Sequence, residues 1–344
     1  MRVFICGYFG YDPEQNDGQT IKTRLVRNVF EAIPDTGVTW FDTQKIKSAF
    51  VSSCFAIVKK AAKADCIVML PGENGLKFIF PLLYLISIFK SSKVIYIVIG
   101  GWLPIITRKS PIVSLLLRKI NKIMVETQLM KKDLESQKFT NVTVLNNFKP
   151  LVDLSAEQPT VENVTFKIVF VSRILKEKGI YELIRAIDVL SKKLDICCDF
   201  YGPVDPEDKE EFSNQIENSE ACNYLGVLAP SEVVRSIRKY DLFAFPTYYH
   251  GEGFPGVLID AMNAGVPVLA SDWRFNPEII KETFNGFLYK YDKFDQLVDK
   301  IRFCAHNRGL LQSMKPNCIS ESKKYDFTYA KNEIFRTIYA VSYN

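Results

Sequence analysis

Hydrophobic residues in the first half of this chain occur in two alternating patterns. Short runs rich in β-branched residues predict buried strands at residues 3–6, 38–41, 66–70, 93–99, 123–126 and 142–145. Between them, hydrophobic residues at helical spacing predict helices at residues 19–33, 46–64 and 76–89. This alternation favours an α/β fold in which helices cover both faces of a parallel sheet.

A second series of the same kind follows a polar segment. Residues 146–165 are polar and acidic and contain two prolines, so they predict a linker. After it, the pattern predicts strands at residues 167–171, 195–201, 242–245, 267–270 and 286–289 and helices at 179–193, 231–239, 256–263, 277–281, 294–306 and 327–341. The economical architecture is two α/β domains of similar size with a cleft between them.

The composition changes this interpretation little. The 344 residues are 47% hydrophobic and 24% charged, which is typical of a globular protein of two domains. The net charge of +5 suits anionic ligands or an acidic membrane surface. Basic residues do not form one block in the sequence, so no nucleic-acid partner is expected.

The cysteines and the amino terminus indicate the compartment. None of the eight cysteines forms a C-x-x-C pair, so neither a zinc site nor a redox motif is predicted. Reduced thiols and a chain that begins directly on a strand, without a signal peptide, lead us to expect a cytoplasmic protein.

One apolar segment leaves two interpretations open. Residues 76–89 are too few to span a bilayer, which takes about twenty residues. They form either a buried helix or a helix whose apolar face touches the inner surface of the membrane. Nearby basic residues would favour anionic lipids in the second case: Lys90, Lys93, Arg108, Lys109, Arg118 and Lys119.

The most informative stretch holds two carboxylates eight positions apart, Glu252 and Asp260. They can stand together if the first lies in a loop at a helix entrance and the second lies inside that helix. Glycines between them allow the backbone to approach a ligand, and carboxylates accept hydrogen bonds from paired hydroxyl groups. This arrangement predicts a nucleotide-sugar site.

A basic loop opens the second domain. Arg173 and Lys178 follow a predicted strand and precede a predicted helix. Ligands of open α/β sheets bind beyond the carboxyl ends of the strands, and these cations could hold phosphate there. Taken alone, the loop could equally be an ordinary solvated one.

Together these features resemble glycosyltransferase family 4. The resemblance rests on Arg173, on Lys178 followed by Gly179, on Glu252 and Asp260, and on the sequence Ala-Gly-Val-Pro-Val at 264–268. It covers nearly all of the second domain and is weaker in the first. It implies the GT-B fold, with domains at residues 1–155 and 163–325 and a C-terminal helix within 326–344 that packs back on the first domain.

The resemblance also implies roles for particular residues. Catalytic roles fall to Arg173 and Lys178, which would hold the donor diphosphate, and to Glu252, which would approach the donor sugar. Donor contacts fall to Gly18, Gln19, Gly226, Val227, Phe254, Pro255, Gly256, Val257 and Asp260. Weaker acceptor-side candidates are Gly101, Trp102 and His250. The implied reaction is transfer of a sugar, with retention, from a nucleotide-diphosphate donor to a glycan or lipid-linked acceptor.

Two departures from the family pattern stand out. The second acid is Asp260 where relatives carry glutamate, and the first domain lacks the histidine that many relatives place after the fourth strand. No Asp-x-Asp motif occurs, so neither a required metal nor another cofactor is expected.

Other enzyme classes lack their motifs in this chain. The dinucleotide fingerprint is missing after the first strand of either domain, and no P-loop or G-x-S-x-G motif occurs. The remaining alternatives are a non-catalytic nucleotide-sugar-binding or assembly subunit of the same fold, and a GT-B epimerase or phosphorylase.

Overall fold

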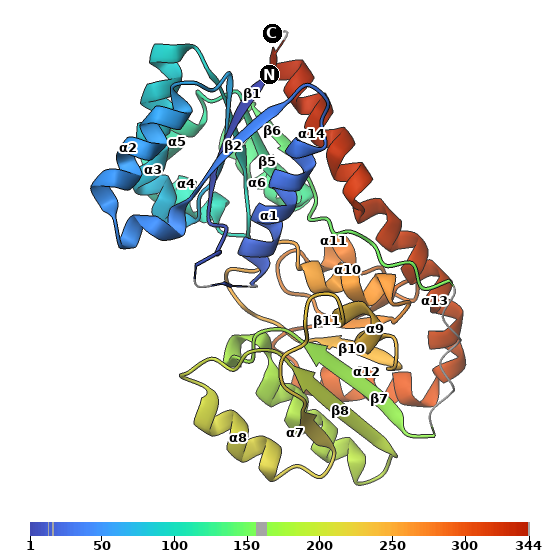
Figure 1. The fold of residues 1–344 in the computed structure, drawn as a ribbon. Helices are drawn as coiled ribbons and strands as arrows, with labels where there is room; N and C mark the ends of the chain where they lie inside the picture. The colour runs from blue at the N-terminus through green and yellow to red at the C-terminus, as the bar shows by residue number, and fades with distance from the viewer. Residues whose placement is uncertain (13, 16, 156–163, 343–344) are drawn as a thin grey trace. The chain divides into compact units, whose positions relative to one another are not determined.

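The computed structural model describes residues 1–12, 14–15, 17–155 and 164–342 and consists of two compact units (Figure 1). Unit 1 contains Met1–Lys149 and Asp326–Asn344, and unit 2 contains Pro150–Tyr325. Each unit is built around its own six-stranded parallel sheet, so the predicted α/β class is confirmed.

The sheet of unit 1 has the strand order β2-β1-β3-β4-β5-β6. Its strands are β1 (Arg2–Gly7), β2 (Gly37–Asp42), β3 (Cys66–Leu70), β4 (Lys93–Ile97), β5 (Lys122–Val125) and β6 (Val142–Val144). Its helices are α1 (Gly18–Glu31), η1 (Thr43–Lys47), α2 (Phe50–Ala61), α3 (Glu73–Lys90), α4 (Leu103–Lys109), α5 (Pro111–Leu117), α6 (Gln128–Ser136) and α14 (Phe327–Ser342). The strand order reverses at β1, because β2 lies on one side of β1 and β3 on the other.

The sheet of unit 2 has the strand order β12-β11-β10-β7-β8-β9. Its strands are β7 (Phe166–Val171), β8 (Ile196–Tyr201), β9 (Cys222–Tyr224), β10 (Leu242–Phe245), β11 (Val268–Ser271) and β12 (Gly286–Tyr289). Its helices are η2 (Lys176–Lys178), α7 (Ile180–Ser191), α8 (Lys209–Glu217), α9 (Val233–Ile237), α10 (Gly256–Asn263), α11 (Asn276–Ile279), α12 (Phe294–His306), α13 (Arg308–Ser322) and η3 (Lys323–Tyr325). Here the order reverses at β7, which lies between β8 and β10.

Several elements differ from the sequence prediction. The helix expected over residues 46–64 is interrupted, because Asp42 caps the short η1 through the backbone N–H of Gln44 and α2 starts only at Phe50. Helix α3 begins at Glu73, three residues before the predicted start at residue 76. Helices α4, α5, α6, α8 and α13 and strand β9 were not predicted; all except α13 have nine residues or fewer, and α13 contains Pro316.

The last helix, α14, packs within unit 1 rather than unit 2. Its residues Ala330, Ile334 and Ile338 are at most 5% exposed and belong to the same hydrophobic core as Val26 and Phe30 of α1. The aromatic rings of Phe327 and Phe148 meet edge to face, 6.4 Å between centres. The predicted return of the C-terminal helix to the first domain is therefore confirmed.

Within the described residues, no helix has the length and apolar character needed to cross a bilayer.

Candidate active site

The predicted basic loop and the predicted acidic loop lie at the reversal point of the sheet in unit 2. The loop after β7 carries Arg173 and Lys178, and the loop after the neighbouring strand β10 carries Glu252. Loops at such a reversal point diverge from each other, which is why ligands of open α/β sheets bind there. The fold therefore brings these three residues to one edge of the sheet.

A close backbone approach fixes the two loops against each other. Gly179 has a φ of +76°, and a Cβ atom on it would lie 2.2 Å from the carbonyl oxygen of Pro246. Only glycine tolerates both the left-handed conformation and the absence of space. Next to this contact, the backbone N–H of Tyr248 donates to the carbonyl of Glu177 at 2.8 Å. The start of α7 is thereby held against the end of β10.

This arrangement pairs Lys178 with Glu252. The Nζ atom of Lys178 lies 2.5 Å from Oε2 of Glu252, and the two side chains are 7% and 12% exposed. The same carboxylate oxygen accepts a hydrogen bond from the Thr247 hydroxyl at 3.1 Å. Burying a charged group is costly unless an opposite charge and hydrogen bonds compensate the loss of water. Glu252 supplies that compensation in this structure.

Tyr249 joins Arg173 to this pair. Its ring centre lies 5.4 Å from Cζ of Arg173 and 4.9 Å from Nζ of Lys178. Both cations therefore face one aromatic ring, whose electron-rich face attracts positive charge. Two cations and one carboxylate leave the cluster with a net charge of +1, which suits an anionic ligand. Arg173 is exposed, whereas Lys178 is 5% exposed.

A layer of hydrogen bonds from the next strand supports Tyr249. The indole N–H of Trp273 donates to the Tyr249 carbonyl at 2.9 Å, and the Ser271 hydroxyl donates to the Thr247 carbonyl at 2.5 Å. The side-chain amide of Asn276 donates to the Ser271 carbonyl at 3.1 Å. The loop after β11 thus fixes the backbone on which Glu252 depends.

The segment between the two predicted acids has a buried side and an accessible side. Phe254 is 4% exposed, and its ring meets that of Tyr325 at 4.9 Å, so its side chain belongs to the core. Pro255 caps α10, and Gly256 and Val257, both partly exposed, form its first turn. Asp260 lies in the middle of α10 and is 6% exposed. The predicted loop-to-helix geometry of the two acids is therefore present.

The remaining predicted residues of unit 2 lie in exposed loops. Gly226 has a φ of +81° with open space where a Cβ would stand, and Val227 is 65% exposed. The Gly226 carbonyl accepts a hydrogen bond from the backbone N–H of Gly202, at the carboxyl end of β8. His250 is exposed, and its ring meets Trp273 edge to face at 5.4 Å.

The first-domain residues Gly18 and Gln19 start α1 in unit 1. Asp17 caps this helix by accepting a hydrogen bond from the Thr20 N–H at 2.8 Å. The Gln19 amide lies 3.6 Å from the position that a Cβ on Gly72 would occupy, so it faces the loop after β3. Gly18 and Gln19 therefore lie at the reversal point of the unit 1 sheet, between the loops after β1 and β3.

Gly101 and Trp102 lie just after β4, next to a turn that contacts a buried ion pair. The sequence analysis did not predict this pair. Lys22 of α1 pairs with Glu126, which follows β5, and both side chains are 2% exposed. The second carboxylate oxygen of Glu126 accepts a hydrogen bond from the backbone N–H of Gly100 at 3.2 Å. The Trp102 indole donates to the Ile99 carbonyl at 2.9 Å. The ion pair thus supports the turn that carries the two candidates.

Sequence reasoning missed Tyr249, Trp273, Lys22 and Glu126. Tyr249 could have been proposed from the sequence, because it lies three positions before Glu252. Lys22 and Glu126 are 104 positions apart in the sequence, so only the fold pairs them.

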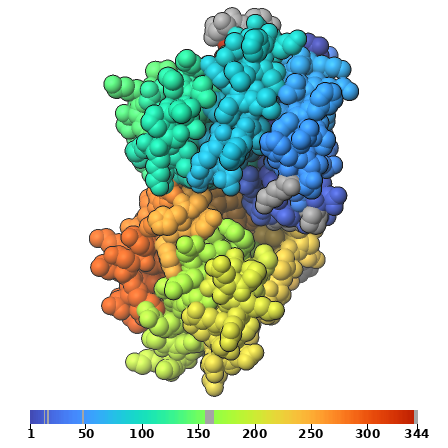
Figure 2. Space-filling model, turned by 90° about the vertical axis from the view of Figure 1, so that its left-hand side faces the viewer, coloured from blue at the N-terminus to red at the C-terminus, as the bar shows by residue number. Residues whose placement is uncertain are grey.

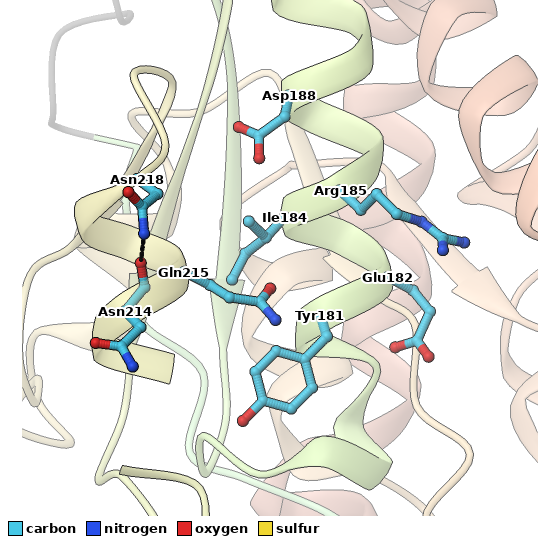
Figure 3. Close-up of a pocket in the computed structure, with 8 residues that line it drawn as sticks. All are labelled: Tyr181, Glu182, Ile184, Arg185, Asp188, Asn214, Gln215 and Asn218. Carbon is cyan, nitrogen blue, oxygen red and sulfur yellow. Dashed lines mark hydrogen bonds between the residues drawn. The ribbon is translucent and has the colours of Figure 1, made fainter. Parts of the chain in front are cut away.

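Two further observations concern other possible sites. Among the side chains that the structure describes, no three His, Cys, Asp or Glu residues are grouped so as to hold a metal ion. A hollow of about 440 Å³ lies between α7 and α8 (Figure 3). It contains none of the predicted residues; Tyr181 at its edge donates to the carboxylate of Asp208 at 2.8 Å.

Two parallel-sheet units of this topology define the GT-B class of folds. The solved structure of Anabaena Alr3699/HepE in complex with UDP matches this chain with a TM-score of 0.78 at 16% identity, covering 99% of this chain and 100% of that chain. The same protein in complex with UDP-glucose matches with a TM-score of 0.76 over the same shares. At such low identity, these likenesses establish the fold alone.

A family model described as Glycosyl transferases group 1 matches residues 155–321. The match lies within unit 2, so the second unit is similar to this family, and the predicted resemblance is confirmed.

Curated relatives match about half of this chain. The capsular polysaccharide biosynthesis glycosyltransferase CapM of Staphylococcus aureus is 26% identical over 210 residues, which cover 61% of this chain and 53% of the relative. The N,N'-diacetylbacillosaminyl-diphospho-undecaprenol alpha-1,3-N-acetylgalactosaminyltransferase of Campylobacter jejuni is 27% identical over 159 residues, 46% of this chain and 40% of the relative. The matches therefore span about half the length of these relatives or less.

Proposed function

We propose that this protein is a retaining glycosyltransferase that moves a sugar from a nucleotide-diphosphate donor to a glycan or lipid-linked acceptor. The observation that carries the proposal is the cluster of Arg173, Lys178 and Glu252 at the sheet reversal of unit 2. The similarity of unit 2 to the family and the named activities of CapM and of the Campylobacter enzyme support it.

The proposed chemistry begins with the donor diphosphate. Arg173 and Lys178 would bind its oxygens, and the partial positive charge at the start of α7 would add to theirs. When the bond between sugar and diphosphate breaks, negative charge grows on the departing phosphate oxygen. Cations already held in place stabilise that charge without reorganisation. Retention follows if the incoming hydroxyl attacks from the face that the diphosphate leaves.

Glu252 would hold Lys178 in position and approach the donor sugar. Its oxygen Oε2 contacts Lys178 and Thr247. The donor phosphate and Glu252 would both contact Lys178. Donor binding would therefore bring the sugar next to the Glu252 carboxylate. Asp260 would accept hydrogen bonds from the ribose hydroxyls, and its burial on α10 would hold it rigidly for that task.

Uracil is the base we propose to test first, since the HepE structures contain UDP and UDP-glucose. For the acceptor we propose a lipid-linked glycan, since the Campylobacter relative is named for a diphospho-undecaprenol substrate. Together with the cytoplasmic location expected from the sequence, this acceptor leads us to propose that the reaction takes place at the inner face of the membrane.

The test is a thermal-shift screen of nucleotide-sugars followed by a transfer assay. A donor present at about a hundred times its dissociation constant stabilises the native state by about 2.7 kcal/mol, which gives a measurable shift. We expect one nucleotide-sugar to raise the melting temperature and to be consumed faster when a lipid-linked acceptor is added. Binding without hydrolysis or transfer for every acceptor would instead identify a non-catalytic binding subunit.

A further inference from the structure

Three helices form one continuous layer over a face of the unit 1 sheet. Helix α3 packs against α2 on one side and against α5 on the other. Figure 1 shows the three helices beside one another, and Figure 2 shows their outer surface facing the viewer in blue to teal. We call the outer surface of α2, α3 and α5 the three-helix face.

Large hydrophobic side chains are exposed all along the three-helix face. The exposed fractions are 64% for Phe50, 80% for Val51, 71% for Phe55 and 39% for Val58 on α2; 74% for Phe78, 54% for Leu85, 56% for Ile88 and 84% for Phe89 on α3; and 72% for Ile112 and 54% for Leu115 on α5. Single exposed hydrophobic residues are ordinary, but ten of them on three helices that pack side by side mark a surface that contacts something else.

The exposed residues are additional to those that hold the helices on the sheet. In α3, Leu76, Phe80 and Leu83 are fully buried. Phe78 and Phe89 lie eleven positions apart on the outer side, which is three helical turns. The helix is thus apolar on two sides, whereas a helix at a protein surface normally has one polar side. Packing within unit 1 explains only the inner side.

Charge in the segment that carries the three-helix face is predominantly positive. Residues 43–125 contain 13 lysines and arginines but only two acidic residues, a net charge of +11, whereas the whole chain has +5. The rest of the chain is therefore negative overall. The excess of positive charge thus lies in the part of the sequence that includes α2, α3 and α5.

Lysines stand at the ends of the apolar stripes. Lys59 follows Phe55 by four positions on α2, and Lys119 follows Leu115 by four positions at the end of α5, so each is about one turn further along. Lys90 ends α3 directly after Phe89. All three lysines are exposed. Apolar side chains bordered by lysines are the pattern of a surface that lies in the headgroup region of a bilayer.

We infer that the three-helix face binds the surface of a bilayer containing anionic lipids. Its aromatic and aliphatic side chains enter the boundary between headgroups and acyl chains, and its lysines contact the lipid phosphates. The helices lie on the surface rather than crossing it, because the inner side of α3 stays packed on the sheet. This inference is independent of the proposed activity, since membrane binding requires neither donor nor acceptor.

The test is flotation of the full-length protein with lipid vesicles. We expect binding to phosphatidylcholine vesicles that contain phosphatidylglycerol, weak binding to phosphatidylcholine alone, and a loss of binding as salt is raised. The variant Phe55→Glu/Phe89→Glu should reduce binding by about tenfold or more, as expected when two aromatic side chains no longer enter an apolar environment. Both side chains are exposed, so the variant should fold; a thermal melt checks this.

A matched control separates this surface from general effects of added negative charge. Val164 in unit 2 is 88% exposed, so Val164→Glu makes the same kind of change elsewhere. Equal binding by Val164→Glu and Phe89→Glu would overturn the inference, as would an absence of binding to anionic vesicles. Light scattering that shows a dimer lost in Phe89→Glu, with no vesicle binding, would instead assign the face to a second copy of the chain.

Discussion

Lys178 places an ammonium group where few water molecules reach, and Glu252 compensates its charge. Arg173, by contrast, lies in the open and contacts the same Tyr249 ring. The two cations therefore offer separate tests of the proposed diphosphate site, because only Lys178 is also part of the folded interior.

Replacing either cation should lower turnover strongly. We expect Arg173→Ala and Lys178→Ala each to reduce kcat by roughly a hundredfold or more, as for the loss of a preorganised charge at a leaving group. Lys178→Ala should also lower thermal stability, since it leaves Glu252 without its cation. Steady-state kinetics and thermal melts measure the two effects. The neighbouring exposed residue Lys176 supplies the control Lys176→Ala, and near-normal rates in both test variants would place the diphosphate elsewhere.

The buried pair Lys22–Glu126 should contribute to the stability of unit 1 rather than to ligand binding. Lys22→Met leaves a buried carboxylate unpaired, so we expect a loss of about 3–5 kcal/mol in the free energy of unfolding of unit 1. The double variant Lys22→Met/Glu126→Leu should recover much of that loss, because it removes both charges. Urea denaturation measures the difference between the two variants.

An exposed pair of the same residue types is the control. Lys77 and Glu73 on α3 lie 3.2 Å apart and are 48% and 49% exposed. Lys77→Met should change stability by less than about 1 kcal/mol. If Lys22→Met proved no more destabilising than Lys77→Met, the buried pair would not stabilise unit 1.

At the scale of elements, the C-terminal helix α14 belongs to the core of unit 1, although most residues of that core come from the first 149 positions. Ile334 is 1% exposed and lies in the core that α1 and the unit 1 sheet form. We expect Ile334→Ala to cost about 2–5 kcal/mol in unfolding free energy, through lost burial and an unfilled cavity. Denaturant titration followed by hydrogen exchange of α1 amides measures it.

Asn332, exposed on the same helix, gives the matched control Asn332→Ala. A similar small effect of both substitutions would mean that α14 is not docked on unit 1 in solution.

Elements with long hydrophobic runs were predictable, and short ones were not. Buried strands such as β4 and amphipathic helices such as α12 carry a periodic pattern long enough to recognise. Helices α4 and α5 have seven residues each and follow one another around Ser110, so each spans only about two turns, too short for a helical pattern to be recognised. Pro316 conceals α13, since proline ordinarily argues against a helix interior.

The candidate site was predictable where neighbours in the chain form it. Glu252, Phe254 and Asp260 lie on one loop and helix, and resemblance to a family located them. The contact of Lys178 with Glu252 spans 74 positions, and the support of Tyr249 by Trp273 spans 24. Such contacts depend on strand order, which local patterns do not specify.

At the scale of the whole molecule, both units hold neutral thiols in their interiors. Burial raises the pKa of Cys6 and Cys66 in unit 1 to about 12, from an ordinary value of 9.0. In unit 2, burial likewise raises the pKa values of Cys222, Cys304 and Cys318 to about 12. The native state therefore holds these five protons more strongly than the unfolded chain does.

This difference should make the protein sensitive to alkali. Stability is fully present below pH 9, where thiols are protonated in both states, and it should fall as pH rises from about 9 to about 12. Urea midpoints measured below and above pH 9 test the sign. Cys66→Ala should show a shallower fall than Cys54→Ala, because Cys54 is partly exposed. Equal slopes would show that thiol ionisation does not govern the alkaline limit.

Unit 2 is, in the order of the chain, an insertion. The polypeptide leaves unit 1 after Lys149 and re-enters it at Asp326, and these two residues are paired by a parallel bridge. The chain therefore leaves and re-enters unit 1 at adjacent positions. Exchange of all residues between these two positions would replace unit 2 and leave unit 1 unchanged. Chimeras joined at both positions should therefore preserve the native packing of α14, whereas a single crossover should not.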